Sequence, residues 1–166
     1  PAFKDAASAQ AWLGAQGSAP PLAVFSALLE QIQAIDGASI PAAQAVALLN
    51  LLRSAAVPLQ PALEEQFTRK ALPMTAGETG TFEITHQLWA RLGIAYLRLV
   101  PQCTPANRVL PLHRAATAFR MAQYCHFLAA RTCPQLLDQL LVAVLAAAEL
   151  NSILGKPVAD PDFPKY

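Results

Sequence analysis

The chain has 166 residues, of which 54% are hydrophobic and 14% are charged, and its formal net charge is +1. A chain of this length can bury roughly 70% of the surface of the unfolded chain, so it needs neither a disulfide nor a metal to hold a core. The low charge content excludes an intrinsically disordered chain, and the small net charge argues against nucleic acid as a partner.

Prolines, glycines and capping residues divide the first half of the chain into four expected helices. They run over about 5–14, 18–36, 39–57 and 58–72. Within the third, residues 42–57 hold Arg53 as the only charge and are apolar nearly all round. A helix of that kind needs neighbours on most sides, so we expect it to be the central helix of the fold.

The second half opens with a stretch rich in glycine and threonine at residues 73–81, which we expect to be an internal linker. Three further helices are expected over about 82–100, 111–131 and 133–155. In the first of these, Gly93 lies between Trp89 and Tyr96 and favours close approach of another helix; a small-ligand pocket there is the alternative.

No segment has the alternating pattern or the hairpin turns of β-strands. The sequence therefore predicts an all-α fold, a compact bundle of six or seven helices, with an arrangement in two three-helix halves left open. Residues 1–156 form the expected single helical domain, and the proline-rich residues 157–166 form an extended tail or linker.

Three observations bear on the cellular setting. The longest apolar stretch, Leu140–Ala148, is too short for the ~20 residues of a membrane-spanning helix, so no span is expected. The first residues show no signal-peptide pattern. Cys103, Cys125 and Cys133 are odd in number and lack C-x-x-C spacing, which favours reduced thiols. We expect a cytoplasmic protein.

Several short motifs, taken together, resemble a known family. They are Phe3-Lys4-Asp5-Ala6-Ala7-Ser8-Ala9-Gln10-Ala11-Trp12-Leu13, Leu51-Leu52-Arg53 with Glu64-Glu65, Ala71-Leu72-Pro73-Met74, and Leu88-Trp89-Ala90-Arg91-Leu92 with Ala95-Tyr96. This set is similar to the N-terminal helical region of a family of uncharacterised proteobacterial proteins. Some longer members carry a further C-terminal module of the cyclic-dinucleotide signalling type. The resemblance implies a signalling context and supplies no catalytic residues.

Charge is sorted along the chain. Residues 1–83 contain four basic and seven acidic residues (net −3), residues 84–137 contain six arginines and no acid (net +6), and residues 138–166 contain two basic and four acidic residues (net −2). Arginine is the side chain best suited to forked contacts with phosphates and carboxylates. The middle block is therefore the candidate anion-binding region.

Five side chains of this block form the candidate ligand-binding set: Arg91, Arg98, His113, Arg114 and Arg120. Spacings of seven place the first two on one face of a helix, and His113 and Arg120 on one face of the next. If these helices pack antiparallel, the two faces would line a groove. We expect an exposed cluster centred on Arg114 and Arg120.

The alternative is that these arginines pair inside the fold with acidic residues of the first half. The acidic candidates are Glu64, Glu65, Glu78 and Glu83. Ion pairs within a fold produce the same sorting of charge along the chain.

No catalytic motif is present: the histidines lack H-E-x-x-H spacing, and neither a G-x-S-x-G elbow nor a glycine-rich phosphate loop occurs. We expect no catalytic residue, metal or cofactor, and therefore a non-enzymatic interaction or regulatory module. The alternative is a sensor that binds an anionic small molecule or nucleotide through its arginine and histidine face.

The surplus of apolar residues carries two further expectations. The chain should self-associate as a homodimer or bind another protein. Seven side chains should be largely buried in the core: Leu48, Leu49, Leu52, Leu140, Leu141, Val144 and Leu145.

Overall fold

The computed structural model describes residues 1–68, 75–128, 141, 145 and 148. Within this part of the chain the regular elements are all helical, which confirms the all-α class. The α-helices are α1 (Ala6–Ala15), α2 (Pro21–Asp36), α3 (Ala42–Ala56), α4 (Gln60–Thr68), α5 (Ala76–Leu99) and α6 (Val109–Leu128). Single 3₁₀ turns connect some of them: η1 (Val57–Leu59), η2 (Val100–Gln102) and η3 (Pro105–Asn107).

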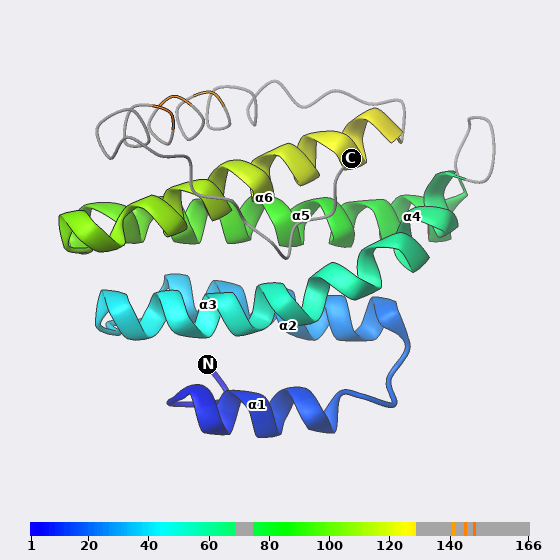
Figure 1. The fold of residues 1–166 in the computed structure, drawn as a ribbon. Coiled ribbons are helices and arrows are strands. Elements are labelled where there is room, and N and C mark those ends of the chain that lie inside the picture. Colours follow the sequence, from blue (N-terminus) through cyan, green and yellow to red (C-terminus); the bar gives the residue numbers. More distant parts are fainter. Residues whose placement is uncertain (69–74, 129–140, 142–144, 146–147, 149–166) are drawn as a thin grey trace.

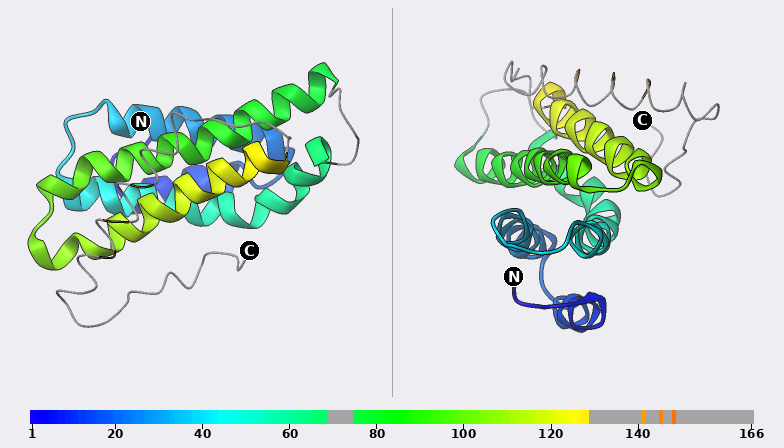
Figure 2. Two further views of the ribbon diagram at one scale, coloured as in Figure 1. Left: turned by 90° about the horizontal axis from the view of Figure 1, so that it is seen from above. Right: turned by 90° about the vertical axis from the view of Figure 1, so that its left-hand side faces the viewer.

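The helices stack in layers, with α1 at one side, α2 and α3 in the middle, and α5 and α6 on the other side (Figure 1). The end-on view in Figure 2 separates the layers clearly. Helix α5 packs against α2, α3, α4 and α6, whereas α3 packs against α1, α2 and α5. The central helix is therefore α5. The expectation that residues 42–57 form it was wrong, because α3 leaves Ala43, Gln44, Ala47 and Ser54 exposed.

The core that these layers enclose is built mainly from alanines, leucines and aromatic residues. Leu48, Leu49 and Leu52 are at most 1% exposed, which confirms their predicted burial. The close approach expected at Gly93 is also present, since a Cβ atom there would lie 2.8 Å from the buried ring of Phe119 on α6. Glycine at this position lets α5 and α6 pack in direct contact.

Two other predicted core residues lie at the surface. Leu141 is 56% exposed and Leu145 is 59% exposed, so their expected burial was wrong. The core forms around α5. Whether an apolar helical stretch is buried depends on the elements that pack against it as well as on its composition, and composition alone was the basis for expecting these leucines to be buried. Leu140 and Val144 lie outside the described residues, as do most of the expected seventh helix and the tail at 157–166.

Helix α5 begins six residues earlier than expected. Thr75 accepts a hydrogen bond from the backbone N–H of Glu78, and the Glu78 carboxylate accepts one from the Thr75 N–H at 2.6 Å. This capping box satisfies two of the N–H groups that a helix start leaves open. Residues 76–81 of the expected linker are therefore helical, and Gly77 and Gly80 lie inside the first turns.

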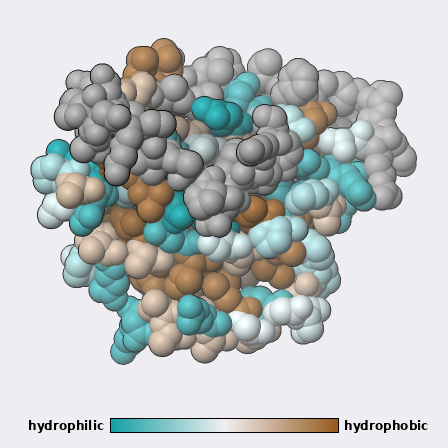
Figure 3. Space-filling model, viewed as in Figure 1, coloured by the Kyte–Doolittle hydropathy of each residue, from teal (hydrophilic) through white to brown (hydrophobic). Residues whose placement is uncertain are grey.

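Helix α1 begins with a second capping box, formed by Asp5 and Ser8. The Asp5 carboxylate accepts a hydrogen bond from the Ser8 N–H at 2.8 Å, and this bond lowers the pKa of Asp5. Phe3 packs on Trp12 with ring centroids 5.5 Å apart, which fastens the N-terminus to this helix. Apolar side chains reach the surface along the seam between α1 and α3 (Figure 3).

Among the residues that the structure describes, one helical run, Ala42–Thr68, is long and apolar enough to cross a membrane by length and composition. It is longer than the apolar stretch on which the expectation of no span was based. Of its most apolar window, 33% is buried inside the fold; this part includes Leu48, Leu49 and Leu52, and Arg53 is only 1% exposed.

Candidate functional site

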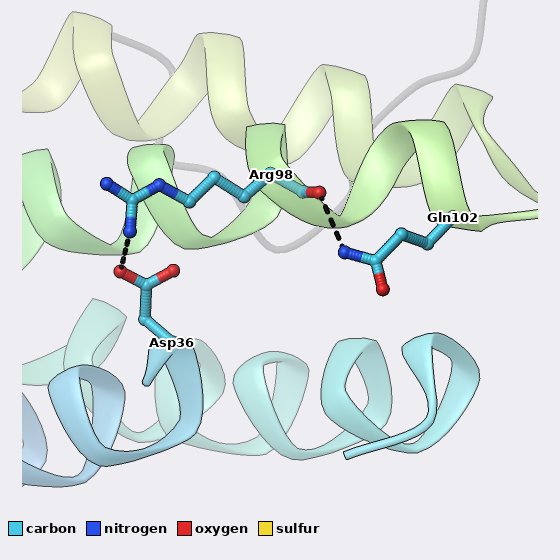
Figure 4. A network of polar contacts seen from close by, with 3 residues as sticks. All are labelled: Asp36, Arg98 and Gln102. Carbon is cyan, nitrogen blue, oxygen red and sulfur yellow. Dashed lines mark hydrogen bonds and ion pairs between the residues drawn. The ribbon is translucent and has the colours of Figure 1, made fainter. Parts of the chain in front are cut away.

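One end of the bundle brings together the end of α2, the start of α3 and the connection from α5 to α6. There Arg98, near the end of α5, donates a hydrogen bond from Nη1 to Oδ2 of Asp36 at 2.7 Å. Gln102 in turn donates from Nε2 to the carbonyl oxygen of Arg98 at 3.2 Å (Figure 4). The ion pair joins α5 to α2, and its two residues are 62 positions apart in sequence.

One hollow is lined by this ion pair, and a second shares one lining residue with the first. The smaller has a volume of about 130 Å³ and is lined by Asp36, Arg98 and Gln102 together with apolar residues such as Ile35 and Leu99. The larger has a volume of about 400 Å³, and Gln102 lines it as well. The two hollows share Gln102 as a lining residue, and together they are called the concave region at the end of the bundle.

The larger hollow is mainly apolar, with a few polar groups. Cys103, Thr104 and Asn107 from the α5–α6 connection line one side, and Ala42 and Ala43 from the first turn of α3 line the other. Pro41 precedes α3 and provides no side-chain cap for that turn. The backbone N–H groups in the first turn of α3 favour negative charge nearby.

Arg108 shapes the connection that forms this side. Its Nε donates to the carbonyl oxygen of Cys103 at 3.0 Å, and its Nη2 donates to that of Pro101 at 3.4 Å. This arginine of the basic block therefore has a structural task, holding the turn between α5 and α6.

The five predicted ligand-binding residues are spread over the molecule. Arg91 and Arg98 are exposed on α5, Arg120 is exposed on α6, and His113 is half-buried. Arg114 is only 8% exposed, so an exposed cluster centred on Arg114 and Arg120 was wrong. These two are six positions apart, which puts them on different sides of a helix, and α6 turns Arg114 towards the interior.

The expected groove between α5 and α6 needs arginines that face α6. The two helices do run antiparallel (Figure 1). Arg98, however, reaches to α2, on the side of α5 away from α6 (Figure 4). Arg98 instead forms an ion pair with Asp36, an acidic residue of the first half, as the alternative interpretation expected of these arginines.

A buried polar cluster in the core was missed from the sequence. Gln60 is fully buried; it accepts a hydrogen bond from Nε1 of Trp89 at 2.7 Å and donates to Glu64 at 3.0 Å and to the Cys125 sulfur at 3.5 Å. Burial raises the pKa of the Cys125 thiol to about 12. A thiol held protonated in this way is a poor nucleophile, so Cys125 acts as a core residue.

Metal ligands do not gather in the part of the chain that the structure describes: no three His, Cys, Asp or Glu side chains there could hold one ion. The residues that do converge are an arginine, a carboxylate and an amide beside an apolar hollow. Such a combination suits an organic ligand with both polar edges and flat apolar faces.

A comparison with protein families gives a specific match. The model for the family described as "Cyclic-di-GMP receptor FimW, N-terminal domain" matches residues 7–165. The chain belongs to this family. The comparisons with curated proteins and with solved structures find no match.

Membership of the FimW N-terminal domain family makes the sequence-based expectation more specific. The sequence motifs indicated the N-terminal helical region of an uncharacterised family in a signalling context. This family is compatible with that expectation and is more specific. A receptor domain also agrees with a regulatory role in place of an enzymatic one.

Proposed function

We propose that this chain is a non-enzymatic regulatory domain that binds cyclic di-GMP at the end of the bundle where α2, α3 and α5 meet. The main support is the concave region next to Arg98. The family to which the chain belongs is also named after a receptor for this nucleotide. Arg98 belongs to the five arginine and histidine residues predicted from the sequence, and it lines the smaller hollow of this region.

The ligand and the region have matching properties. Cyclic di-GMP is a ring of two guanosine monophosphate units, with a negative phosphate and a flat base in each. Pockets for ligands of that size measure about 300–1,000 Å³ and combine apolar walls with a few polar groups. The larger hollow, at about 400 Å³, falls in this range, and the smaller one adds to it.

The test is a calorimetric titration of the 166-residue chain with cyclic di-GMP, with GTP as the comparison nucleotide. We expect saturable binding of cyclic di-GMP and much weaker binding of GTP. The bound nucleotide should be recovered unchanged by chromatography, because a receptor binds without turnover. Failure of the chain to bind the nucleotide would contradict the proposal and would favour a domain that passes on a signal received by another module.

We propose in addition that the chain self-associates. Leu141 and Leu145 support this, since both are large apolar side chains at helical spacing and more than half exposed. A regulatory domain that pairs with a second copy would act through assembly and needs no catalytic group.

A further inference from the structure

We infer that the ion pair of Arg98 and Asp36 is a binding subsite for a guanine base, with the rest of the dinucleotide in the adjoining larger hollow. This inference rests on the proposed function and goes further. It names the base, the two residues that bind it, and the resulting preference for guanine over adenine.

The ion pair leaves hydrogen-bonding groups unused at the edge of the smaller hollow. Arg98 meets Asp36 with one nitrogen only, Nη1 on Oδ2 (Figure 4). Within the described part of the chain, Nε and Nη2 of Arg98 and Oδ1 of Asp36 make no further hydrogen bond. The pair thus presents free donors beside a free acceptor. Because 64% of the Arg98 side chain is exposed, a ligand can reach it.

Guanine carries the complementary groups. Its O6 and N7 atoms accept the two parallel hydrogen bonds that an arginine fork donates. Its N1–H and N2–H groups donate to a carboxylate, which accepts two bonds. Adenine has an amino group where guanine has O6, and it lacks the N1–H and the N2 amino group, so it satisfies each of the two side chains only in part.

The carboxylate also argues for a base over a phosphate at this point. A phosphate beside Asp36 would meet a like charge, whereas a neutral base with N–H groups does not. The uncapped first turn of α3, in the larger hollow, is the better neighbour for a phosphate. The two hollows therefore differ in the part of a nucleotide that each would accept.

The size and walls of the smaller hollow agree with a single base. At about 130 Å³ it is smaller than a pocket for a whole drug-sized ligand. Ile35, Ile40 and Leu99 provide apolar surface for the flat faces, and Ala45 and Ala95 leave room because their side chains are short. Gln102 lines both hollows, so its amide lies within reach of a ligand that occupies the two together.

The experiment is calorimetry of cyclic di-GMP and of cyclic di-AMP with the unaltered chain and three variants. Arg98→Ala and Asp36→Asn remove the two partners. Arg91→Ala is the matched control, because Arg91 is an exposed arginine one heptad earlier on α5 and lines neither hollow. We expect both subsite variants to weaken cyclic di-GMP binding at least tenfold, with Arg91→Ala within twofold of the unaltered chain.

The second ligand separates reading of a base from attraction to charge. The unaltered chain should prefer cyclic di-GMP over cyclic di-AMP, and Asp36→Asn should reduce that preference. Tight binding that survives both subsite variants would overturn this inference and leave the proposed function standing. Equal weakening by Arg98→Ala and Arg91→Ala, with Asp36→Asn leaving binding unchanged or tighter, would also overturn it. That pattern indicates general electrostatics, because an anion binds less tightly when a positive charge is lost and more tightly when a negative charge is lost. Absence of any binding to the unaltered chain would refute the proposed function itself.

Discussion

At the scale of single residues, Gly93 shows how one missing side chain sets the distance between two helices. Gly93→Ala would place a Cβ atom 2.8–2.9 Å from the fully buried Phe119 ring, so the ring or the two helices would have to shift. We expect a loss of about 1–3 kcal/mol in the free energy of unfolding, as for other overpacked cores. Urea denaturation measures it.

The control lies on the same helix. Gly80→Ala introduces a Cβ atom with nothing within 4 Å, so it should stabilise α5 by roughly 0.5–1 kcal/mol through the lower entropy of the unfolded chain. Two changes of the same kind would then have opposite signs. Equal effects would show that helix propensity, and not contact with Phe119, decides the outcome at Gly93.

Because of Cys125, the free energy of unfolding should decrease at alkaline pH. Its pKa is about 12 in the fold and near 9.0 when unperturbed, so between these values the native state keeps a proton that the unfolded state loses. The stability contributed by the buried thiol is complete below about pH 9 and decreases as pH rises towards 12, by up to about 1.4 kcal/mol per pH unit. Denaturation at several pH values, compared with Cys125→Ala, isolates this slope. Identical slopes for the two proteins would contradict the assignment.

At the scale of elements, Gln60 joins α4, α5 and α6 through one amide group. Gln60→Leu would leave the Trp89 N–H buried without an acceptor, which costs about 1–3 kcal/mol. Adding Trp89→Phe removes that orphaned donor, so the double variant should lose less than the two single losses added together. Denaturation of the four proteins of this cycle gives the coupling; strict additivity would argue against the hydrogen bond.

Two leucines test which helical faces form the core. Leu49→Ala should cost about 2–5 kcal/mol, because Leu49 is fully buried on α3. Leu141→Ala should change stability by less than about 1 kcal/mol, since more than half of that side chain is exposed. The same substitution thus separates a core position from a surface position. A large loss at Leu141 in the monomer would place it in the core after all.

At the scale of the whole molecule, the exposed leucines predict assembly. We expect a dimer that buries about 1,200–2,000 Å² in total, visible by light scattering at high micromolar concentration. Leu141→Glu with Leu145→Glu should yield monomers, because two charges would be desolvated at the interface. Ala23→Glu, at an exposed site on α2, is the control and should leave the dimer intact. Monomers of the unaltered chain at that concentration would contradict the prediction.

The helices could be predicted because their signals are local. Prolines at 21 and 41 and apolar residues at three- and four-residue steps act within one element, whatever the rest of the chain does. The start of α5 was missed because Gly77 and Gly80 favour a linker, while the capping box of Thr75 and Glu78 outweighs them.

The central helix and the site could be predicted only in part. An alanine-rich helix such as α3 does not specify which side meets a neighbour, so its composition suggested more burial than the fold provides. Arg98 belonged to the predicted set, but its partner Asp36 lies 62 positions earlier, and only the packing of α2 on α5 brings them together. Periodicity within a helix contains no information about such a meeting.

The antiparallel contact of α5 with α6 has a consequence for the order of folding. These helices follow each other directly in sequence and share the tight contact at Gly93, whereas α2 meets α5 only after a long loop has closed. Local pairings form before distant ones, because closing a long loop costs entropy before any contact rewards it. A two-helix nucleus of α5 and α6 would then be present in the transition state. Substitutions at their contact would slow refolding, while those in α1 would mainly accelerate unfolding.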